Sequence, residues 1–340
     1  MSTFTQLGHF GRIKFGKLFK VIEFAIIMGP ADAWDVLLSR FRYFGESMFS
    51  GSMVALVTPM HENGAVDEAA FERLVAWHLE VGTDALVVLG TTGEAPALSS
   101  DEKEWLVKTT VSMVQGKCPV IVGAGSNITQ HTVGLAQEAV AWGADALLIV
   151  TPYYNRPTQA GLVRHYQAVA ESVSTPIILY NVPGRTGCDL LPATAIELAQ
   201  LDNIVAIKEA TGQLERVSQI LRATDQLAVL SGDDATASAA MMLGAKGVIS
   251  VVANVVPELM KQLCDYALAG RVEDVKALDQ ILSPLYSHSM INPNPIPTKW
   301  MLEQMGLISS GIRLPLVPLE QACHDFVMAA MKALNIPLKA

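Results

Sequence analysis

The sequence has few cysteines and no clustered metal ligands. Its 340 residues include four cysteines, Cys118, Cys188, Cys264 and Cys323, which stand far apart and form no C-x-x-C pair. A chain of this length can bury enough apolar surface to fold without disulfides, so we expect reduced thiols and a cytoplasmic location. The seven histidines form no H-E-x-x-H or comparable spacing, so we expect no metal ion.

Long apolar runs and basic clusters are also missing. The apolar stretch at residues 24–28 is far shorter than the roughly 20 residues needed to cross a bilayer, so we expect no membrane segment. The formal net charge of −9, with no Lys/Arg cluster interleaved with aromatic residues, disfavours nucleic acid as a partner. A hydrophobic content of 51% and a charged content of 17% instead predict a globular protein with a large core.

The first 47 residues differ from the rest. Of the 24 basic and 33 acidic residues, six and four respectively fall in this segment, so the sign of the charge changes after it. Its basic part is followed by the short apolar stretch, but Gly29-Pro30 ends that stretch without a clear cleavage site, which disfavours a signal peptide. We expect residues 1–47 to be a loosely attached extension or a misassigned start, and the patterned domain to begin at Met48.

From Met48 the sequence repeats a short apolar run followed by a helical pattern, in units of about 25 to 30 residues, which is typical of βα units. Eight runs predict strands at residues 53–58, 85–90, 120–125, 146–151, 176–181, 204–209, 227–232 and 247–252. Helical patterns lie between them, for example at residues 67–81, 101–114, 129–142, 161–173 and 214–223. Eight parallel strands close most naturally into a (β/α)8, or TIM, barrel. An open doubly wound sheet is the alternative, but Gly-Ala-Gly at 123–125 lacks the further residues of a dinucleotide site.

The sixth predicted strand carries a lysine among small and β-branched residues. Strand alternation places Ala206, Lys208 and Ala210 on one face and Glu209 on the other. Apolar surroundings remove water from an ammonium group and favour the neutral amine, which is a nucleophile toward carbonyl compounds. The pattern alone supports two readings about equally, a Schiff-base lysine and a structural lysine paired to a carboxylate, and the rest of the chain must decide between them.

Polar residues gather at the expected carboxyl ends of the strands, where the active site of such a barrel lies. The runs are Gly-Thr-Thr-Gly-Glu at 90–94, Thr-Pro-Tyr-Tyr-Asn at 151–155 and Tyr-Asn-Val-Pro-Gly-Arg-Thr-Gly at 180–187. Backbone N–H groups and hydroxyls in the first run suit a small carboxylate. Plainer roles are helix capping for Thr91 and Thr92, ring packing for Tyr180 and a solvated charge for Arg185.

Together these motifs resemble the dihydrodipicolinate synthase family, within the superfamily of lysine-dependent pyruvate aldolases and N-acetylneuraminate lyases. The resemblance runs from about residue 48 to the C-terminus and includes Ser-Gly-Asp-Asp at 231–234, Gly-Val-Ile-Ser at 247–250 and Asn-Pro-Asn-Pro at 292–295. It implies a catalytic (β/α)8 barrel at residues 48–270 followed by a C-terminal helical region at 271–340, with no cofactor. One such motif would be weak evidence, but the ordered set is specific.

The resemblance also implies a reaction, the condensation of pyruvate with L-aspartate 4-semialdehyde by a lyase of lysine and diaminopimelate biosynthesis. The expected assembly is a homotetramer, a dimer of dimers. Lys208 would form the imine with pyruvate. Tyr180 would move protons, with Thr91 as a relay to Tyr154, which would reach in from a neighbouring subunit.

The remaining implied site residues bind substrate. Thr92 and the amide around Ile249 would hold pyruvate, and Arg185 would receive the carboxylate of the semialdehyde. Sugar-acid aldolases share the imine chemistry and are one alternative. A catalytically silent barrel that binds small acids is another, although the presence of Lys208 and Tyr180 disfavours it.

One branch of the family is inhibited by lysine, and the residues that would bind it are replaced here. The serine, histidine and glutamate positions of that site hold Ala95, Ser100, Lys103 and His131. Because free lysine carries two ammonium groups, loss of an acidic partner and gain of Lys103 disfavour its binding. The resemblance thus implies an enzyme insensitive to lysine, even though Tyr153 remains.

Overall fold

The computed structural model describes residues 49–339, so the extension expected at residues 1–47 lies outside the described residues. Strands and helices alternate along this part of the chain. In order they are β1 (Gly51–Ala55), α3 (Glu68–Val81), β2 (Ala85–Val88), η1 (Ala95–Ala97), α4 (Ser100–Val114), β3 (Val120–Gly123), α5 (Thr129–Ala141), β4 (Ala146–Val150), α6 (Gln159–Ser172), β5 (Ile177–Asn181), α7 (Pro183–Thr186), α8 (Pro192–Leu198), β6 (Ile204–Glu209), α9 (Leu214–Ala223), β7 (Ala228–Ser231), α10 (Asp234–Met242), β8 (Gly247–Ser250), η2 (Val252–Asn254), α11 (Pro257–Leu268), α12 (Val272–His288), α13 (Ile296–Gln304) and α14 (Gln321–Ala333).

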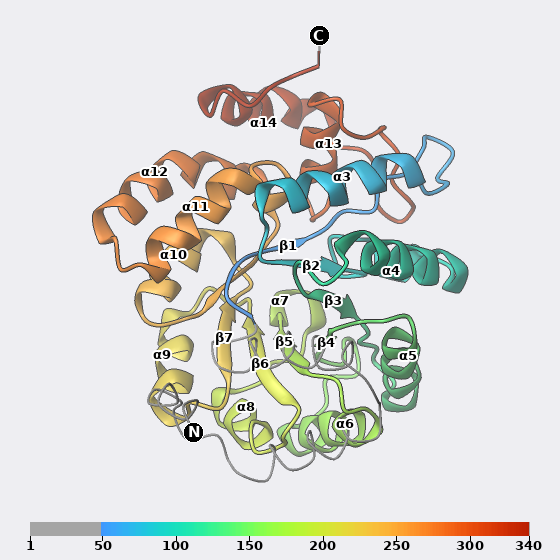
Figure 1. Ribbon diagram of the computed structural model, residues 1–340, viewed down its shortest axis with the longest axis vertical. Helices are drawn as coiled ribbons and strands as arrows, with labels where there is room; N and C mark the ends of the chain where they lie inside the picture. The colour runs from blue at the N-terminus through green and yellow to red at the C-terminus, as the bar shows by residue number, and fades with distance from the viewer. Residues whose placement is uncertain (1–48, 340) are drawn as a thin grey trace, which may run out of the picture. The chain divides into compact units, whose positions relative to one another are not determined.

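The eight strands form one closed parallel barrel in sequence order, because β1 pairs with both β2 and β8. Helices surround the strands, and the C-terminal helices α13 and α14 lie beyond α3 and α12, outside that ring (Figure 1). The predicted (β/α)8 barrel with a C-terminal helical region is therefore confirmed. None of the described helices is both long and apolar enough to span a bilayer.

The first strand is displaced from its predicted position at residues 53–58. It starts earlier because Gly51 pairs with Gly247, a close approach that leaves no apolar signal in the sequence. It ends earlier because two backbone hydrogen bonds at its end are made with a side chain and not with a neighbouring strand. Asn254 accepts a hydrogen bond from the Val57 amide at 3.0 Å and donates one to the Ala55 carbonyl at 2.8 Å. The other strands begin within one residue of their predicted starts.

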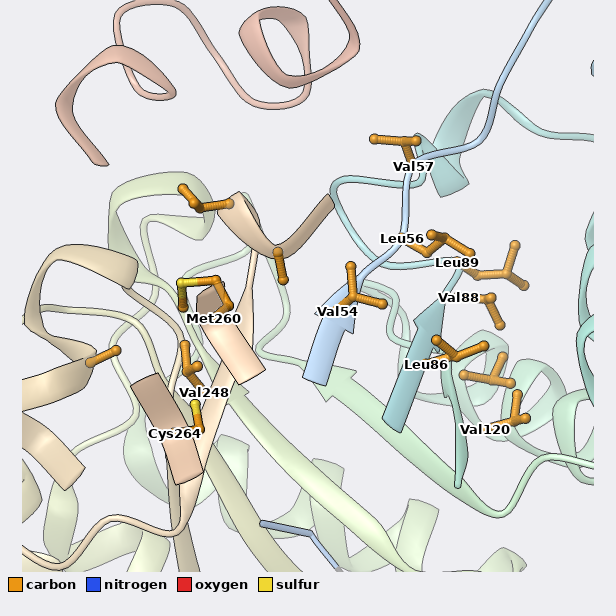
Figure 2. Packing of buried hydrophobic residues seen from close by; sticks show 14 of the residues in the cluster. Val54, Leu56, Val57, Leu86, Val88, Leu89, Val120, Val248, Met260 and Cys264 are labelled. Carbon is orange, nitrogen blue, oxygen red and sulfur yellow. The ribbon is translucent and has the colours of Figure 1, made fainter. Parts of the chain in front are cut away.

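Alternate strand residues serve two different cores. Outward-facing residues pack against the helices, as Val248 does beside Met260 and Cys264 of α11, and as Val54, Leu86 and Val88 do around the barrel (Figure 2). Inward-facing residues fill the barrel itself and are also buried: Met53, Val87, Ile121, Leu148, Ile178, Leu230 and Ile249. Both faces are apolar because each packs away from water, which is why the runs look continuous in the sequence.

Helix capping leaves the threonines of the second strand's loop free for another role. The N-cap of α4 is Ser99, whose hydroxyl accepts from the Glu102 amide while the Ser99 amide donates to the Glu102 carboxylate. This reciprocal pair satisfies two exposed amides at the start of the helix. Thr91 and Thr92 therefore do not cap α4.

Candidate active site

A cavity of about 80 Å³ opens at the carboxyl ends of the barrel strands. Of the predicted site residues, five line it: Thr91, Thr92, Tyr180, Arg185 and Lys208. Apolar inward-facing side chains, including Val87 and Leu148, line much of the remainder. The structure thus brings together side chains from the second, fifth and sixth strand ends, as their sequence positions predict.

Lys208 lies inside the barrel on β6, with 5% of its surface exposed. Its register partner on β5 is Tyr180, and the Lys208 Nζ lies 4.4 Å from the centre of the Tyr180 ring. Across residues 49–339, no carboxylate lies within ion-pair distance of Lys208. The alternative of a structural lysine paired with a carboxylate is therefore wrong for this part of the chain, and the amine is directed at the cavity.

Gly232, just after β7, leaves room for the Lys208 side chain. A β-carbon at Gly232 would lie 2.9 Å from both Cγ and Cε of Lys208 and 2.6 Å from the β-carbon of Ala210. Such distances are shorter than side chains allow, and the Ala210 carbon cannot swing away because it is attached to the backbone of its strand. The sequence signal was present in Ser-Gly-Asp-Asp, but no role for this glycine was predicted.

The loop after β2 is fixed from the C-terminal region. Thr92 is buried, and its Oγ1 accepts a hydrogen bond from Asn294 Nδ2 at 2.8 Å. Two residues later, the buried Glu94 carboxylate pairs with Lys299 Nζ of α13 at 2.6 Å. Burial lowers the pKa of Lys299, although the Glu94 carboxylate opposes that shift. The asparagine and this buried ion pair were not predicted, because both join segments distant in the sequence.

Arg185 lies on the short helix α7 at the mouth of the cavity, with an exposed side chain. Its guanidinium has no carboxylate partner within the described range. The helix is held in place by the loop after β4, since the Tyr154 amide donates to the Thr186 carbonyl at 3.1 Å and Arg156 Nε donates to the Gly187 carbonyl at 3.1 Å. A forked cation held in this way suits a carboxylate entering from solvent.

Two predicted residues do not line the cavity of their own chain. Tyr154 is 88% exposed and adopts a left-handed backbone, with φ of 70°. Ile249 is buried within β8, and Val251 lines the cavity instead. The backbone after β8 is held by Asp234, whose Oδ2 accepts hydrogen bonds from the Val251 and Val252 amides at 3.0 and 3.1 Å.

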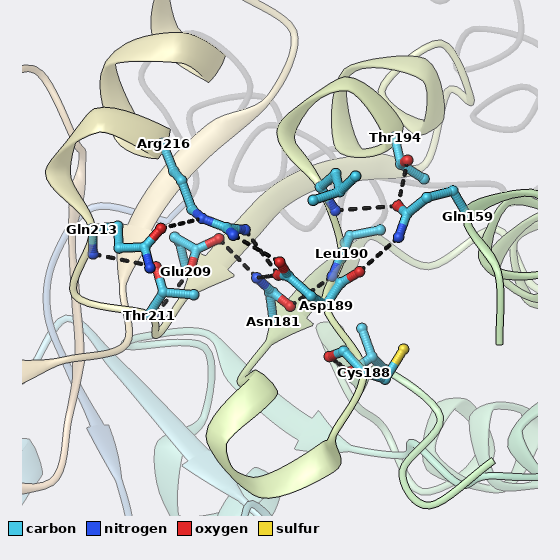
Figure 3. Close-up of polar contacts among 12 residues, drawn as sticks. Gln159, Asn181, Cys188, Asp189, Leu190, Thr194, Glu209, Thr211, Gln213 and Arg216 are labelled. Atoms are coloured by element: carbon cyan, nitrogen blue, oxygen red, sulfur yellow. Dashed lines mark hydrogen bonds and ion pairs between the residues drawn. The ribbon is translucent and has the colours of Figure 1, made fainter. Parts of the chain in front are cut away.

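A second polar network lies on the outer face of the strands that carry Tyr180 and Lys208 (Figure 3). Asn181 Nδ2 donates to Glu209 Oε2 at 3.0 Å and to Asp189 Oδ1 at 3.1 Å, and Arg216 of α9 binds both Asp189 oxygens at 2.8 and 2.7 Å. Burial raises the pKa of Asp189, but the Arg216 and Asn181 hydrogen bonds outweigh it and leave that pKa below the usual value. The network ties the two strand ends together, on the face predicted for Glu209.

A (β/α)8 barrel that holds a buried lysine beside a tyrosine, with no carboxylate partner for the lysine among residues 49–339, is typical of the barrel lyases that act through a lysine imine. The family model described as the dihydrodipicolinate synthetase family matches residues 48–334. The chain belongs to this family, which confirms the predicted resemblance. In the described part, no group of three or more His, Cys, Asp or Glu side chains is placed to hold a metal ion.

Individual relatives agree with the family match. The 4-hydroxy-tetrahydrodipicolinate synthase of Coxiella burnetii is 52% identical over 289 residues, covering 85% of this chain and 99% of the relative. That of Cellvibrio japonicus is 50% identical over 286 residues, covering 84% and 99%. A crystal structure of the chloride-inhibited dihydrodipicolinate synthase of Acinetobacter baumannii, in complex with pyruvate, superposes with a TM-score of 0.83 at 47% identity and covers 84% of this chain and 99% of that one.

Proposed function

We propose that this protein condenses pyruvate with L-aspartate 4-semialdehyde, the activity of a 4-hydroxy-tetrahydrodipicolinate synthase. The single observation that carries the proposal is Lys208, buried at the cavity with no carboxylate partner in the described range and with Tyr180 beside it. The similar enzymes of Coxiella burnetii and Cellvibrio japonicus carry the same activity in their names, and the Acinetobacter baumannii enzyme binds pyruvate.

The reaction begins with an imine at Lys208. The neutral amine attacks the ketone carbon of pyruvate, and the resulting carbinolamine loses water to leave an iminium group. The positive nitrogen then accepts the electron pair released when the pyruvate methyl group loses a proton. This gives an enamine, whose terminal carbon is the nucleophile for the next step.

The second substrate enters at the mouth, where the Arg185 guanidinium binds its carboxylate. The enamine carbon attacks the aldehyde carbon and forms the new carbon–carbon bond, while the aldehyde oxygen takes up a proton. The amino group of the former semialdehyde then attacks the iminium carbon and displaces the Lys208 amine, which closes the ring and frees the enzyme.

Proton movement is assigned to three hydroxyl groups. Tyr180 lies against Lys208 and is placed to move protons during imine formation and ring closure. Thr91 lines the same cavity and relays protons onward. Tyr154 completes the relay in the site of a neighbouring subunit, since it is exposed and does not line its own cavity. A tyrosine hydroxyl is a poor base at neutral pH, so the proposed mechanism passes protons through the three hydroxyls in turn.

Pyruvate binding is assigned to Thr92 and to the backbone amide around Ile249, together with the hydroxyl-rich loop after β2. We place the protein in the cytoplasm as a homotetramer built from two dimers, an assembly that gives Tyr154 a neighbouring site. The exposed ring of Tyr154 and the exposed side chain of Ile128, on the loop before α5, are the observations that support such a contact.

Borohydride trapping tests the proposal. The protein is incubated with pyruvate, reduced and digested, and the modified peptide is identified by mass. We expect the added mass of reduced pyruvate on the Lys208 peptide, its loss in Lys208→Ala, and its retention in Lys108→Ala, whose lysine is exposed on α4. Label on another lysine, or none on active enzyme, would overturn the mechanism. Turnover of N-acetylneuraminate in place of the semialdehyde would instead identify a sugar-acid aldolase.

A further inference from the structure

The segment between α12 and α13 brings Asn294 into the cavity wall. Asn294 is 6% exposed, lines the cavity and donates from Nδ2 to Thr92 Oγ1 at 2.8 Å. The two residues lie 202 positions apart in the chain. This bond is therefore a tertiary contact between the C-terminal region and the loop proposed to hold pyruvate.

We propose that Asn294 is a positioning residue that aims the Thr92 hydroxyl at the carboxylate of the bound keto acid. The inference rests on the proposed function, because it assumes a keto acid in the cavity. A hydroxyl has one hydrogen to donate and two lone pairs to accept with. The Asn294 amide occupies a lone pair of Thr92 Oγ1, so the hydroxyl hydrogen is directed away from Asn294.

Thr92 has nowhere else to send that hydrogen within residues 49–339. Its only described side-chain hydrogen bond is the one it accepts from Asn294, and its side chain lines the cavity. A carboxylate in the cavity is an acceptor for the unused hydrogen, and a hydrogen bond to a charged acceptor is stronger than a neutral one. A hydroxyl can either donate or accept a hydrogen bond, and the bond from Asn294 leaves the Thr92 hydroxyl to act as a donor toward the cavity.

Asn294 is held firmly enough to impose this direction. Pro293 and Pro295 flank it, and the Lys299 amide donates to the Pro295 carbonyl at 2.9 Å in the first turn of α13. The same helix carries Lys299, whose buried ion pair with Glu94 holds the loop two residues beyond Thr92. Two contacts thus connect α13 and the residues before it to the loop after β2.

The unpaired atom of Asn294 also favours a role at the site over a role in stability. Its Oδ1 is buried and has no hydrogen-bond partner among the described residues. Buried polar groups are normally satisfied, and exceptions gather at functional sites. A side chain kept only to join two segments would be expected to use both ends of its amide.

Kinetics of two variants test the proposal. Asn294→Leu keeps the approximate side-chain volume but removes the donor, so we expect the KM for pyruvate to rise about tenfold or more, the value for one charge-assisted hydrogen bond. Asn294→Asp accepts the Thr92 hydrogen instead of donating, so the loss should exceed that of Asn294→Leu. The KM for the semialdehyde should stay near that of the unmodified protein in both. Asn292→Leu is the matched control, because Asn292 lies in the same segment but does not line the cavity.

A double-variant cycle separates positioning from stability. Once Thr92→Val has removed the hydroxyl, adding Asn294→Leu should raise the pyruvate KM no further. Additive effects, or a fall in kcat with unchanged pyruvate KM, would overturn the proposal. If Asn294→Leu does not fold, Asn294→Asp answers the same question. Its rise in pyruvate KM should then be at least as large as that of Thr92→Val, and a smaller rise would contradict the proposal. Failure of the unmodified protein to trap pyruvate on Lys208 would instead reject the proposed function, so the two failures are distinct.

Discussion

Gly232 and Lys208 touch so closely that no side chain fits between them. A β-carbon at Gly232 would lie 2.9 Å from Lys208 Cε, whereas ordinary carbon contacts are about 3.5 to 4.0 Å. The backbone just after β7 therefore forms one wall of the space that the lysine side chain occupies. Because Ala210 forms part of the same contact, the wall is made of small residues that directly follow two neighbouring strands.

We expect Gly232→Ala to abolish imine formation with little change in fold. The added methyl group would lie 2.9 Å from two carbons of Lys208 and 2.6 Å from the Ala210 β-carbon, so the lysine side chain must move away and the local backbone must also shift slightly. Trapping with pyruvate and borohydride should fall at least tenfold while the circular dichroism spectrum is retained. Gly134→Ala on α5 is the control, because its β-carbon meets no neighbour, and it should keep full activity and gain about 0.5 to 1 kcal/mol of stability. Normal trapping by Gly232→Ala would show that Lys208 does not need this space.

Mixing two inactive variants tests whether Tyr154 serves a neighbouring subunit. Tyr154→Phe and Lys208→Ala should each lower turnover by about a hundredfold or more, since one loses the proton relay and the other the nucleophile. In a symmetric dimer with exchanged subunits, about a quarter of the sites regain both groups, so activity should return toward that fraction. Activity of the mixture is measured after exchange has been shown by mass spectrometry.

The control for that experiment replaces Tyr154→Phe by Tyr180→Phe. Tyr180 and Lys208 line one cavity of a single chain, so no mixed dimer of these two variants contains an intact site. This mixture should stay inactive. Recovery in the control, or no recovery with Tyr154→Phe despite proven exchange, would contradict the shared site.

Local patterns were enough to predict the barrel and the direction of Lys208. A period of two residues determines which side chains share a face, so the sequence alone assigns Ala206, Lys208 and Ala210 to one side of the strand. The same rule placed Glu209 on the other side, where it meets Asn181. Such predictions succeed because they depend on neighbours within a single strand.

Contacts between distant segments could not be predicted in this way. Nothing near Asn294 in the sequence indicates that its partner is Thr92, and an ion pair between Lys299 and Glu94 joins residues 205 positions apart. A glycine that makes room for a lysine leaves no periodic signal either. These features depend on how the closed barrel and the C-terminal helices pack, which the local pattern does not contain.

We expect residues 1–47 to be dispensable for folding and activity. The family match begins at residue 48, and the preceding composition has the opposite charge balance. A protein beginning at Met48 should have the kcat and KM of the full chain and a melting temperature within about 2 °C, a shift that corresponds to about 1 kcal/mol for a large domain. A larger fall in melting temperature or a loss of turnover on truncation would show that the extension packs on the barrel.

Buried histidines should make the protein less stable as the pH falls below 6.5. Burial lowers the pKa of His78 on α3 from 6.5 to about 3, and that of His165 on α6 to about 4. Between these values and 6.5 the unfolded chain binds protons that the folded chain does not. The free energy of unfolding therefore decreases with falling pH, by at most about 1.4 kcal/mol per pH unit for each group.

Urea unfolding at several pH values between 4.5 and 8 measures this dependence. We expect His78→Leu to reduce the slope of the free energy of unfolding against pH below pH 6.5. The reduction should correspond to about one bound proton, or at most about 1.4 kcal/mol per pH unit. His131→Leu is the matched control for removing a histidine, because the His131 side chain is exposed on α5. An unchanged slope in His78→Leu would contradict the assignment to His78.

The family resemblance implies that the lysine-binding residues of the inhibited branch are replaced here, and we expect no inhibition by physiological lysine. In that branch an acidic side chain faces the ammonium groups of the ligand, whereas this chain has His131 at that position and Lys103 at a histidine position. The serine position holds Ala95, at the start of η1. Each lost charge-assisted contact is worth about 1.5 to 3 kcal/mol, or more than tenfold in affinity, so several together remove useful binding.

An initial-rate assay titrated with lysine decides this, and a double variant shows the cause. Restoring glutamate at position 131 with His131→Glu and removing the like charge with Lys103→His should move the inhibition curve toward lower lysine concentrations. Neither residue lines the cavity, so the KM for pyruvate should stay the same in the absence of lysine. Lys108→His is the charge-matched control on α4 and should leave the enzyme insensitive, because its side chain pairs with Glu104 on the helix surface. Strong inhibition of the unmodified protein by low lysine concentrations would refute the prediction, since it would require an ammonium-binding site that does not depend on the replaced acid.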